Sequence, residues 1–194
     1  RPQLVVVTGQ GIPGDEAAAA RAAVQLSALL PGNGGVLVLG EKANLQGLVD
    51  VGVDPRLLPG HRPASEAATG VGWTARDACL AAGRREVGAL LLGGVDPVRT
   101  FPRGHRGRAA VEGADFVLCL DAFLTDSARM ADVVLPVAIL AERQGSTIGL
   151  DCVRRRLRRA LPPPAALPGD GDLLREVAAR LGAALPEGEE LQNE

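Results

Sequence analysis

The sequence predicts an α/β fold, with a Rossmann-like, open and mostly parallel sheet of about five strands that carries helices on both faces. Two observations lead to this prediction. Entirely apolar runs, such as FVLCL at 116–120, indicate strands that are buried on both faces, as parallel strands between helix layers are. A helical stretch lies between the first two such runs, which is the order of a βαβ unit.

In chain order, the first strand is expected at Leu4 to Thr8 and the second at Gly35 to Leu39, and they should pair in parallel. The helix between them should run from Asp15, which can cap it, to Leu30. From Glu41 to Ser65 glycines and prolines break every period, so we expect a long, structured loop.

The second half supplies the remaining elements. We expect a helix from Thr74 to Gly83, a strand at Ala89 to Leu92 and a surface helix or loop at His105 to Gly113. Thr125 and Asp126 can cap a short helix after the strand at 116–120. The last strand, VVLPVAIL, should lie at a sheet edge or stop at Pro136, because proline has no N–H to donate.

The carboxyl-terminal part is expected to form a linker, a helix and a tail. We predict a Rossmann-like domain over 1–160, a proline-rich linker over 161–169, a packing helix over 170–185 and an acidic tail over 186–194. Asp172 can cap the helix, whose packing face should consist of Leu173, Leu174, Val177, Ala178 and Leu181.

Composition excludes several classes of function. Aromatic residues are 2% of the chain and the formal net charge is -2, which disfavours nucleic acid as a partner. No apolar run reaches the roughly 20 residues that cross a bilayer, so we expect no membrane insertion. The three cysteines have no C-x-x-C spacing for zinc or an iron–sulfur cluster, and they suit a reducing cytoplasm. The chain starts at Arg1 rather than methionine, which suggests a piece of a longer polypeptide.

One generic motif offers a nucleotide site. Gly9, Gly11 and Gly14 form a G-x-G-x-x-G that follows a strand and opens a helix, as in an NAD-binding module, and Glu41 could bind the ribose. Pro13 has no N–H for a phosphate, and Asp15 would place a carboxylate beside it. A glycine-rich turn without a ligand is the alternative.

Catalytic groups are not evident. His61 and His105 lie in loops away from any candidate nucleophile, and Cys119 falls inside a strand, where a thiol is inert. Cys152 precedes a run of arginines that could activate its thiol, but a cysteine without a reactive role is the favoured interpretation. The arginine run at 154–159 is either a solvated face or a docking patch for an acidic partner subunit.

Several separate stretches carry the motifs of one family. ANLQG at 43–47, followed by Asp50, Gly52, Pro55 and LPG at 58–60, is similar to the pattern A-N-x-Q-G, D-x-G-x-x-P and L-P-G. GGVDP at 93–97 is similar to a strand-end motif of the same family, and the stretch from Asp121 to Ser146 is similar to D-x-F-x-T-E-T-A, A-D-V-V-L-P and E-x-x-G-T. Order and spacing agree over about 1–182, so the chain resembles the molybdopterin-type oxidoreductases.

Within that superfamily, the GGVDP form and the L-P-G-x-R-P loop favour a likeness to the large G subunit of bacterial NADH:quinone oxidoreductase, respiratory complex I. This likeness implies a Rossmann-like docking domain without a cofactor or metal of its own. Iron–sulfur clusters are expected in an amino-terminal part, and the partners would be other subunits of the peripheral arm. The location would be cytoplasmic, at the inner face of the cell membrane. The resemblance implies no catalytic residue in this segment.

The alternative implied by the same resemblance is a domain that binds molybdopterin guanine dinucleotide, as in a formate dehydrogenase. The rim of that site would be Gly93, Gly94, Asp96, Asp121 and Thr125. After Glu142 the family continues G-T-x-T-N-x-E-G-R, whereas this chain has GSTIGLDCV at 145–153. The departure favours an inherited scaffold that has lost its cofactor.

Overall fold

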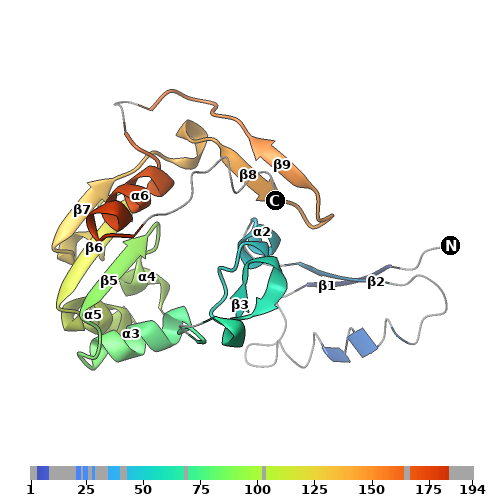
Figure 1. The fold of residues 1–194 in the computed structure, drawn as a ribbon, viewed down its shortest axis with the longest axis horizontal. Helices are drawn as coiled ribbons and strands as arrows, with labels where there is room; N and C mark the ends of the chain where they lie inside the picture. The colour runs from blue at the N-terminus through green and yellow to red at the C-terminus, as the bar shows by residue number, and fades with distance from the viewer. Residues whose placement is uncertain are drawn as a thin grey trace. The chain divides into compact units, whose positions relative to one another are not determined.

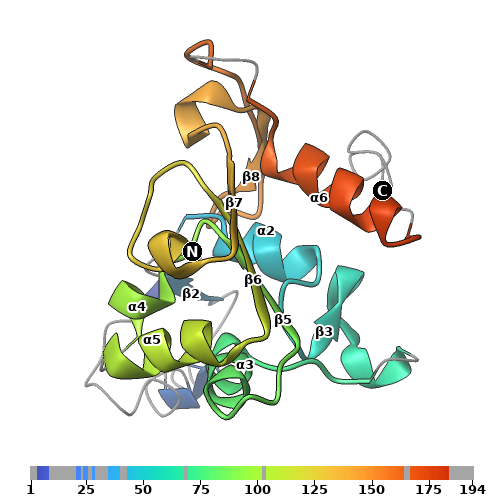
Figure 2. The same cartoon turned by 90° about the vertical axis from the view of Figure 1, so that its left-hand side faces the viewer.

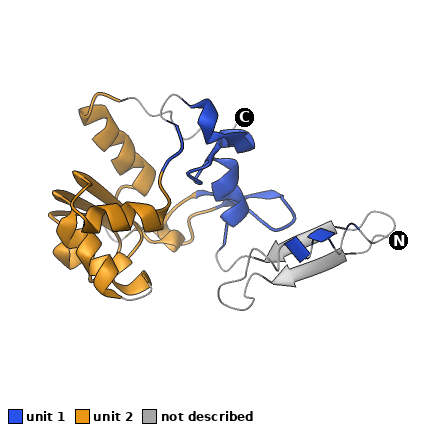
Figure 3. Ribbon diagram, turned by 90° about the horizontal axis from the view of Figure 1, so that it is seen from below, with its two compact units in different colours: residues 1–72, 145–157 blue, residues 73–144, 158–194 orange. Residues whose placement is uncertain are grey.

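The computed structural model describes residues 4–8, 21–22, 24–25, 28, 35–39, 43–67, 70–101, 104–163 and 167–183 (Figure 1). The chain divides into two compact units, which are coloured separately in Figure 3. The first unit comprises residues 1–72 and 145–157, and the second comprises residues 73–144 and 158–194.

The first unit begins with two parallel strands, β1 (Leu4–Thr8) and β2 (Gly35–Leu39). Both have the predicted bounds, and Leu4 lies opposite Gly35 at the start of the pair. Of the helix predicted between them, residues 21–22, 24–25 and 28 are described, and all of these are helical. The βαβ order is therefore confirmed as far as it is described.

The segment 41–65 is richer in structure than predicted. It contains α2 (Leu45–Asp50), a short antiparallel pair of β3 (Leu57–Leu58) and β4 (Arg62–Pro63), and two single turns of 3-10 helix, η1 (Pro59–His61) and η2 (Ala64–Glu66). The loop prediction was wrong in detail because these elements are too short to produce a hydrophobic period. They are instead stabilised by contacts between them.

A hairpin distant in sequence completes the first unit. Strands β8 (Gly145–Ile148) and β9 (Arg154–Leu157) pair antiparallel. Asn44, at the amino end of α2, adopts a left-handed φ of 62°, and its Oδ1 accepts a hydrogen bond from the Ile148 N–H at 2.8 Å. A Cβ on Gly47 would lie 2.2 Å from that oxygen. The ANLQG motif therefore shapes the contact between α2 and β8.

The second unit is built on a three-stranded parallel sheet in the order β5 (Ala89–Gly93), β6 (Phe116–Asp121) and β7 (Val133–Pro136). The buried core against it consists of Leu92, Val111, Val117, Cys119 and Ala128. Strand β7 is at the edge and ends at Pro136, opposite Asp121, as predicted. The two apolar runs therefore pair as neighbours.

Helices cover both faces of this sheet. On one side lie α3 (Ala75–Gly83) and α5 (Gly104–Gly113), and on the other lies α6 (Asp170–Arg180), as Figure 2 shows. The cap predicted for α3 is confirmed, since Thr74 Oγ1 accepts a hydrogen bond from the Asp77 N–H at 3.1 Å.

Helix α5 buries one face, at Gly107, Ala110, Val111 and Gly113, and exposes the other. A Cβ on Gly107 would lie 2.0 Å from the Pro97 carbonyl oxygen, and one on Gly113 would lie 2.0 Å from the Ala82 carbonyl oxygen. Glycine at these two positions permits backbone contact with α4 (Pro97–Thr100) and α3. Of the two alternatives predicted for His105 to Gly113, the structure has the surface helix, and the glycines on its buried face allow the close packing.

Helix α6 begins two residues before Asp172, whose carboxylate accepts a hydrogen bond from the Gly169 N–H at 3.2 Å. The predicted packing face is half-buried at Leu173, Leu174, Val177 and Ala178. Leu181 is 80% exposed, because the helix has ended before it. Arg143 forms an ion pair with Asp170, and this pair ties the helix to the segment after η4 (Leu140–Glu142).

The α/β class with parallel strands and helices on both faces is confirmed. The five predicted strands are present, divided between the pair β1–β2 and the sheet β5–β6–β7. The predicted linker at 161–169 is neither helix nor strand at 161–163 and 167–169. The division at 160 stays a prediction.

Candidate functional site: the carboxyl edge of the three-stranded sheet

The ends of β5 and β6 bring all five residues of the predicted rim to one edge of the second unit. The carboxyl edge of a parallel sheet is where open α/β folds bind ligands. Gly93 closes β5, and Gly94 follows with a left-handed φ of 60°. The Gly94 N–H donates to the Leu120 carbonyl oxygen at 2.9 Å. A Cβ on Gly93 or Gly94 would meet nothing within 4 Å, so the space above both glycines is open.

Asp96 and Ser127 join the loops that follow β5 and β6. The Ser127 hydroxyl donates to Asp96 Oδ1 at 2.5 Å, and the Ser127 N–H donates to the same oxygen at 3.2 Å. Ser127 Oγ in turn accepts a hydrogen bond from the Val98 N–H at 3.1 Å, and the residue is completely buried. The loops are therefore held together by a serine whose hydroxyl is both donor and acceptor.

The charge of Asp96 follows from this network. Burial acts to raise its pKa, but hydrogen bonding by Ser127, together with the main-chain amides of Arg99 and Asp126, lowers the pKa below its ordinary value on balance. Asp96 is therefore ionised at neutral pH. Its second oxygen, Oδ2, is buried and accepts no hydrogen bond within the described residues. A buried carboxylate oxygen without a donor is costly, and it suits a ligand N–H or O–H group.

Asp121 and Thr125 shape the turn after β6. Asp121 Oδ1 accepts a hydrogen bond from the Phe123 N–H at 2.9 Å, and Thr125 Oγ1 accepts one from the Ala128 N–H at 3.2 Å. Ala128 opens η3 (Ala128–Met130), whose cap residue is Ser127 rather than the predicted Thr125, although Thr125 binds the first amide of that turn. The turn leaves Phe123 70% exposed, beside an exposed Leu124. Both polar side chains thus have a role in folding.

The rim fits the nucleotide end of a dinucleotide cofactor. Open glycines allow a pyrophosphate to approach the backbone, and an exposed aromatic ring offers a stacking surface. Asp96 Oδ2 is an acceptor for an N–H group such as those of a purine. The second set of predicted residues, Gly9, Gly11 and Gly14, lies outside the described residues, so the NAD-binding alternative stays a prediction.

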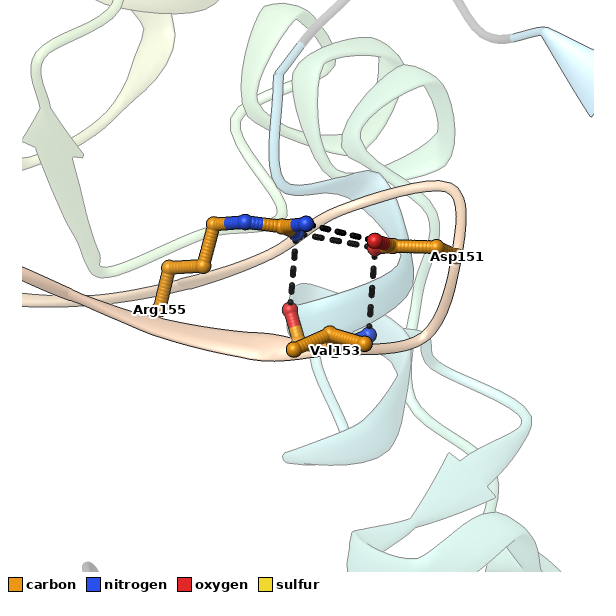
Figure 4. Close-up of polar contacts among 3 residues, drawn as sticks. All are labelled: Asp151, Val153 and Arg155. Atoms are coloured by element: carbon orange, nitrogen blue, oxygen red, sulfur yellow. Dashed lines mark hydrogen bonds and ion pairs between the residues drawn. The ribbon is translucent and has the colours of Figure 1, made fainter.

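The hairpin of the first unit is where the chain departs from the family pattern. At its turn, both oxygens of Asp151 bind the guanidinium of Arg155, at 2.8 and 2.5 Å (Figure 4). Asp151 also accepts a hydrogen bond from the Val153 N–H at 3.2 Å, and Arg155 donates to the Val153 carbonyl oxygen. Hydrogen bonding from Arg155 holds the pKa of Asp151 well below its usual range. Cys152 is exposed, with a left-handed φ of 57°.

Within the described residues, the other reactive groups lie apart from one another. His61 Nε2 lies 2.6 Å from Asp50 Oδ1, which also accepts a hydrogen bond from Gln46, and His105 is exposed. Cys119 is buried, and this burial raises the pKa of its thiol, as expected for an inert residue. Among the described residues there is no cluster of three or more possible metal ligands. None of the helices in this part of the chain is both long and apolar enough to span a bilayer.

Ser127 and Asn44 both fall within the motif stretches of the sequence, but their structural roles were not predicted. Ser127 follows Thr125-Asp126 in a polar turn, and nothing in its neighbourhood distinguishes a buried serine from a solvated one. The Asn44 contact spans 104 residues, which no local pattern reveals. A short polar residue that tolerates left-handed backbone, three residues before a glycine, was the available signal for Asn44.

Comparisons with known proteins identify the family. The family model for molybdopterin oxidoreductases matches residues 6–180. The alpha subunit of the NADPH-Fe(3+) oxidoreductase of Geobacter sulfurreducens is 34% identical over 82% of this chain and 20% of its own length. The G subunit of the NADH-quinone oxidoreductase of Streptomyces coelicolor is 35% identical over 63% of this chain and 16% of its length.

Formate dehydrogenase H of Escherichia coli is 29% identical over 80% of the chain and 24% of its own length. Among solved structures, acetylene hydratase from Pelobacter acetylenicus has a TM-score of 0.49 at 17% identity, over 66% of this chain and 17% of that one. The chain thus spans between 16% and 24% of the length of these curated relatives.

Proposed function

Because the chain belongs to the molybdopterin oxidoreductase family, we propose that it is a structural and docking domain of the G subunit of a NADH-quinone oxidoreductase. In this role it supports electron transfer from NADH to quinone without a redox centre of its own. The GGVDP and L-P-G-x-R-P motifs support this choice, and so does the relationship to G subunits that are 35% and 32% identical.

The observation that carries the proposal is the closed hairpin turn at 149–153. Here the family pattern has an asparagine, a glycine and an arginine that this chain lacks. Arg155, two residues after the turn, binds Asp151 and the Val153 carbonyl within the hairpin. A guanidinium used in this way is not offered to a cofactor phosphate. The hairpin therefore serves its own fold.

In this proposal the partners are other subunits of the peripheral arm, at the inner face of the cell membrane. Iron–sulfur clusters belong to an amino-terminal part of the polypeptide. Catalysis occurs elsewhere in the assembly, and this domain positions its neighbours. A large covered interface is consistent with exposed apolar side chains such as Val51, Val53 and Leu140.

The test uses the protein in its own cells. The chain is tagged at its locus, and membranes are solubilised and separated by native electrophoresis. We expect the tag to co-migrate with NADH:quinone activity and with less than stoichiometric molybdenum. Co-migration with formate-oxidising activity, or one molybdenum atom per chain, would overturn the proposal.

A second candidate rests on the rim of the second unit. The unpartnered Asp96 Oδ2 and the open space over Gly93 and Gly94 fit the guanine dinucleotide of a molybdopterin cofactor. The two glycines would admit the pyrophosphate, and Asp96 would accept a hydrogen bond from the nucleotide and fix its orientation. When bound in such an enzyme, the cofactor supplies the redox chemistry, and this chain holds its nucleotide end.

Calorimetry with GDP, which carries the guanine and the pyrophosphate, separates the two candidates. If the second is correct, GDP binds and Asp96→Asn weakens binding about tenfold, because the amide loses the charge that strengthens a hydrogen bond. Ser146→Ala, at an exposed position of the hairpin, is the control. If the heat of GDP injection equals that of injecting GDP into buffer, GDP does not bind and the second candidate fails.

A further inference from the structure

Strand β9 and the residues that follow it concentrate positive charge. Five of the six residues from 154 to 159 are arginine, in a chain whose net charge is -2. Three of them, Arg154, Arg155 and Arg156, form the exposed part of β9, and we call this strand the basic edge. The proposed docking role does not by itself explain this concentration of arginines.

The register of the hairpin shows which residues of β9 direct their main-chain N–H and C=O groups away from β8. Ile148 lies opposite Arg154, and its N–H donates to Asn44 rather than to β9. In an antiparallel pair, residues that face the partner with their main-chain groups alternate with residues that face away. Ser146 and Arg156 are paired two positions beyond Ile148 and Arg154, so their main-chain N–H and C=O groups also face away from the partner strand. The Arg156 main chain faces away from β8, and β8 is the neighbour of β9 in the described part of the chain.

The side chains of the basic edge are unequally compensated. Arg155 is neutralised by Asp151. Arg156 is exposed and has no acidic partner among the described residues. Like charges directly opposite one another destabilise a strand pair, so the edge repels a second copy of itself. The same charges favour a strand of opposite sign.

We propose that the basic edge binds an acidic, extended segment of a partner protein, which adds a strand beside β9 and places carboxylates against Arg156. This inference rests on the docking role and gives the partner its chemistry. Main-chain pairing would contribute affinity, and the charges would contribute selectivity. Nucleic acid is disfavoured because aromatic residues are 2% of the chain. An anionic membrane is disfavoured because the hairpin, 145–157, has no aromatic residue for the interface.

Fluorescence anisotropy with the 194-residue chain tests the proposal. The probe is a fluorescein-labelled peptide of alternating glutamate and valine. We expect saturable binding that Arg156→Glu weakens about tenfold, through lost attraction and new repulsion. Arg76→Glu, the same charge change on an exposed face of α3, should leave the affinity unchanged.

Two further arms separate strand pairing from simple charge attraction. A peptide with N-methyl groups on alternate residues keeps its charge but cannot pair, and it should bind at least about tenfold more weakly. A DNA duplex and phosphatidylserine vesicles should both bind more weakly than the acidic peptide. Equal affinity of the N-methylated peptide, an equal loss in Arg76→Glu, tighter binding of DNA or vesicles, or no peptide binding would each overturn the proposal.

Failure here is distinct from failure of the proposed function. If the chain co-migrates with NADH:quinone activity but does not bind the peptide, the proposal for the basic edge fails and the docking role stands. If the chain binds the peptide but co-migrates with another enzyme, the assignment to NADH-quinone oxidoreductase fails.

Discussion

Replacing Ser127 by alanine removes a hydroxyl that stabilises the rim from within. The variant loses the bond from Ser127 to the ionised Asp96 at 2.5 Å and the bond from the Val98 N–H at 3.1 Å. A hydrogen bond to a charged group contributes about 1.5–3 kcal/mol and a neutral one about 1, so we expect a loss of about 2–4 kcal/mol. The small side-chain volume removed adds little to this loss of stability.

Urea unfolding of the variant measures this loss, followed by far-UV circular dichroism. Hydrogen exchange of the β6 amides assigns the change to the second unit, because the two units need not unfold together. The control is Ser146→Ala, the same chemical change at an exposed serine, which should shift stability by less than about 0.5 kcal/mol. A Ser127→Ala variant as stable as this control would refute the reasoning.

The pH dependence provides a second check on the same bond. The pKa of Asp96 is lowered from 3.8 in the folded chain, so its ionised form contributes stability above pH 3.8. That contribution is lost as the pH falls through the lowered folded value. Without the Ser127 donor the folded pKa rises, and the variant should show a smaller loss of stability on acidification below about pH 4 than the parent.

Three other substitutions test packing and backbone. Gly107→Ala places a Cβ 2.0 Å from the Pro97 carbonyl oxygen and should destabilise α5 by about 1–3 kcal/mol in urea unfolding, whereas Gly145→Ala, with nothing within 4 Å, should be nearly neutral. Asn44→Ala should cost about 1–3 kcal/mol and speed exchange of the β8 amides, because a main-chain donor loses its acceptor. Cys152→Gly should raise stability by up to about 1 kcal/mol, since φ is 57° there; a loss would contradict the backbone argument.

Long apolar runs were sufficient to predict the sheet. The run at 116–120 predicted β6, and Pro136 predicted the end of β7, because burial on two faces and a missing N–H are local properties. Helix α5 was predicted only as an alternative, since its packing depends on Gly107, whose role emerges only when another backbone lies against it. Close approach between segments leaves no periodic signal.

The candidate site was predictable in its position but not in its construction. Its members were named from the family resemblance and lie together at one sheet edge, yet the contact that unites the two loops comes from Ser127. That contact joins residues separated by 31 positions, and its strength depends on burial, which a sequence does not display. The α2 segment was missed for a related reason, because six residues around Gly47 are too few to show a helical period.

The motif residues of the rim have two kinds of reason to be present, and these make different predictions. Asp121 and Thr125 accept main-chain hydrogen bonds, so folding alone accounts for them. Folding does not require a glycine at position 93, because its φ is not left-handed and a Cβ there would meet nothing within 4 Å. Gly93→Ala should therefore leave urea unfolding unchanged within about 0.5 kcal/mol. If GDP binds the parent chain and not this variant, the open space holds a ligand.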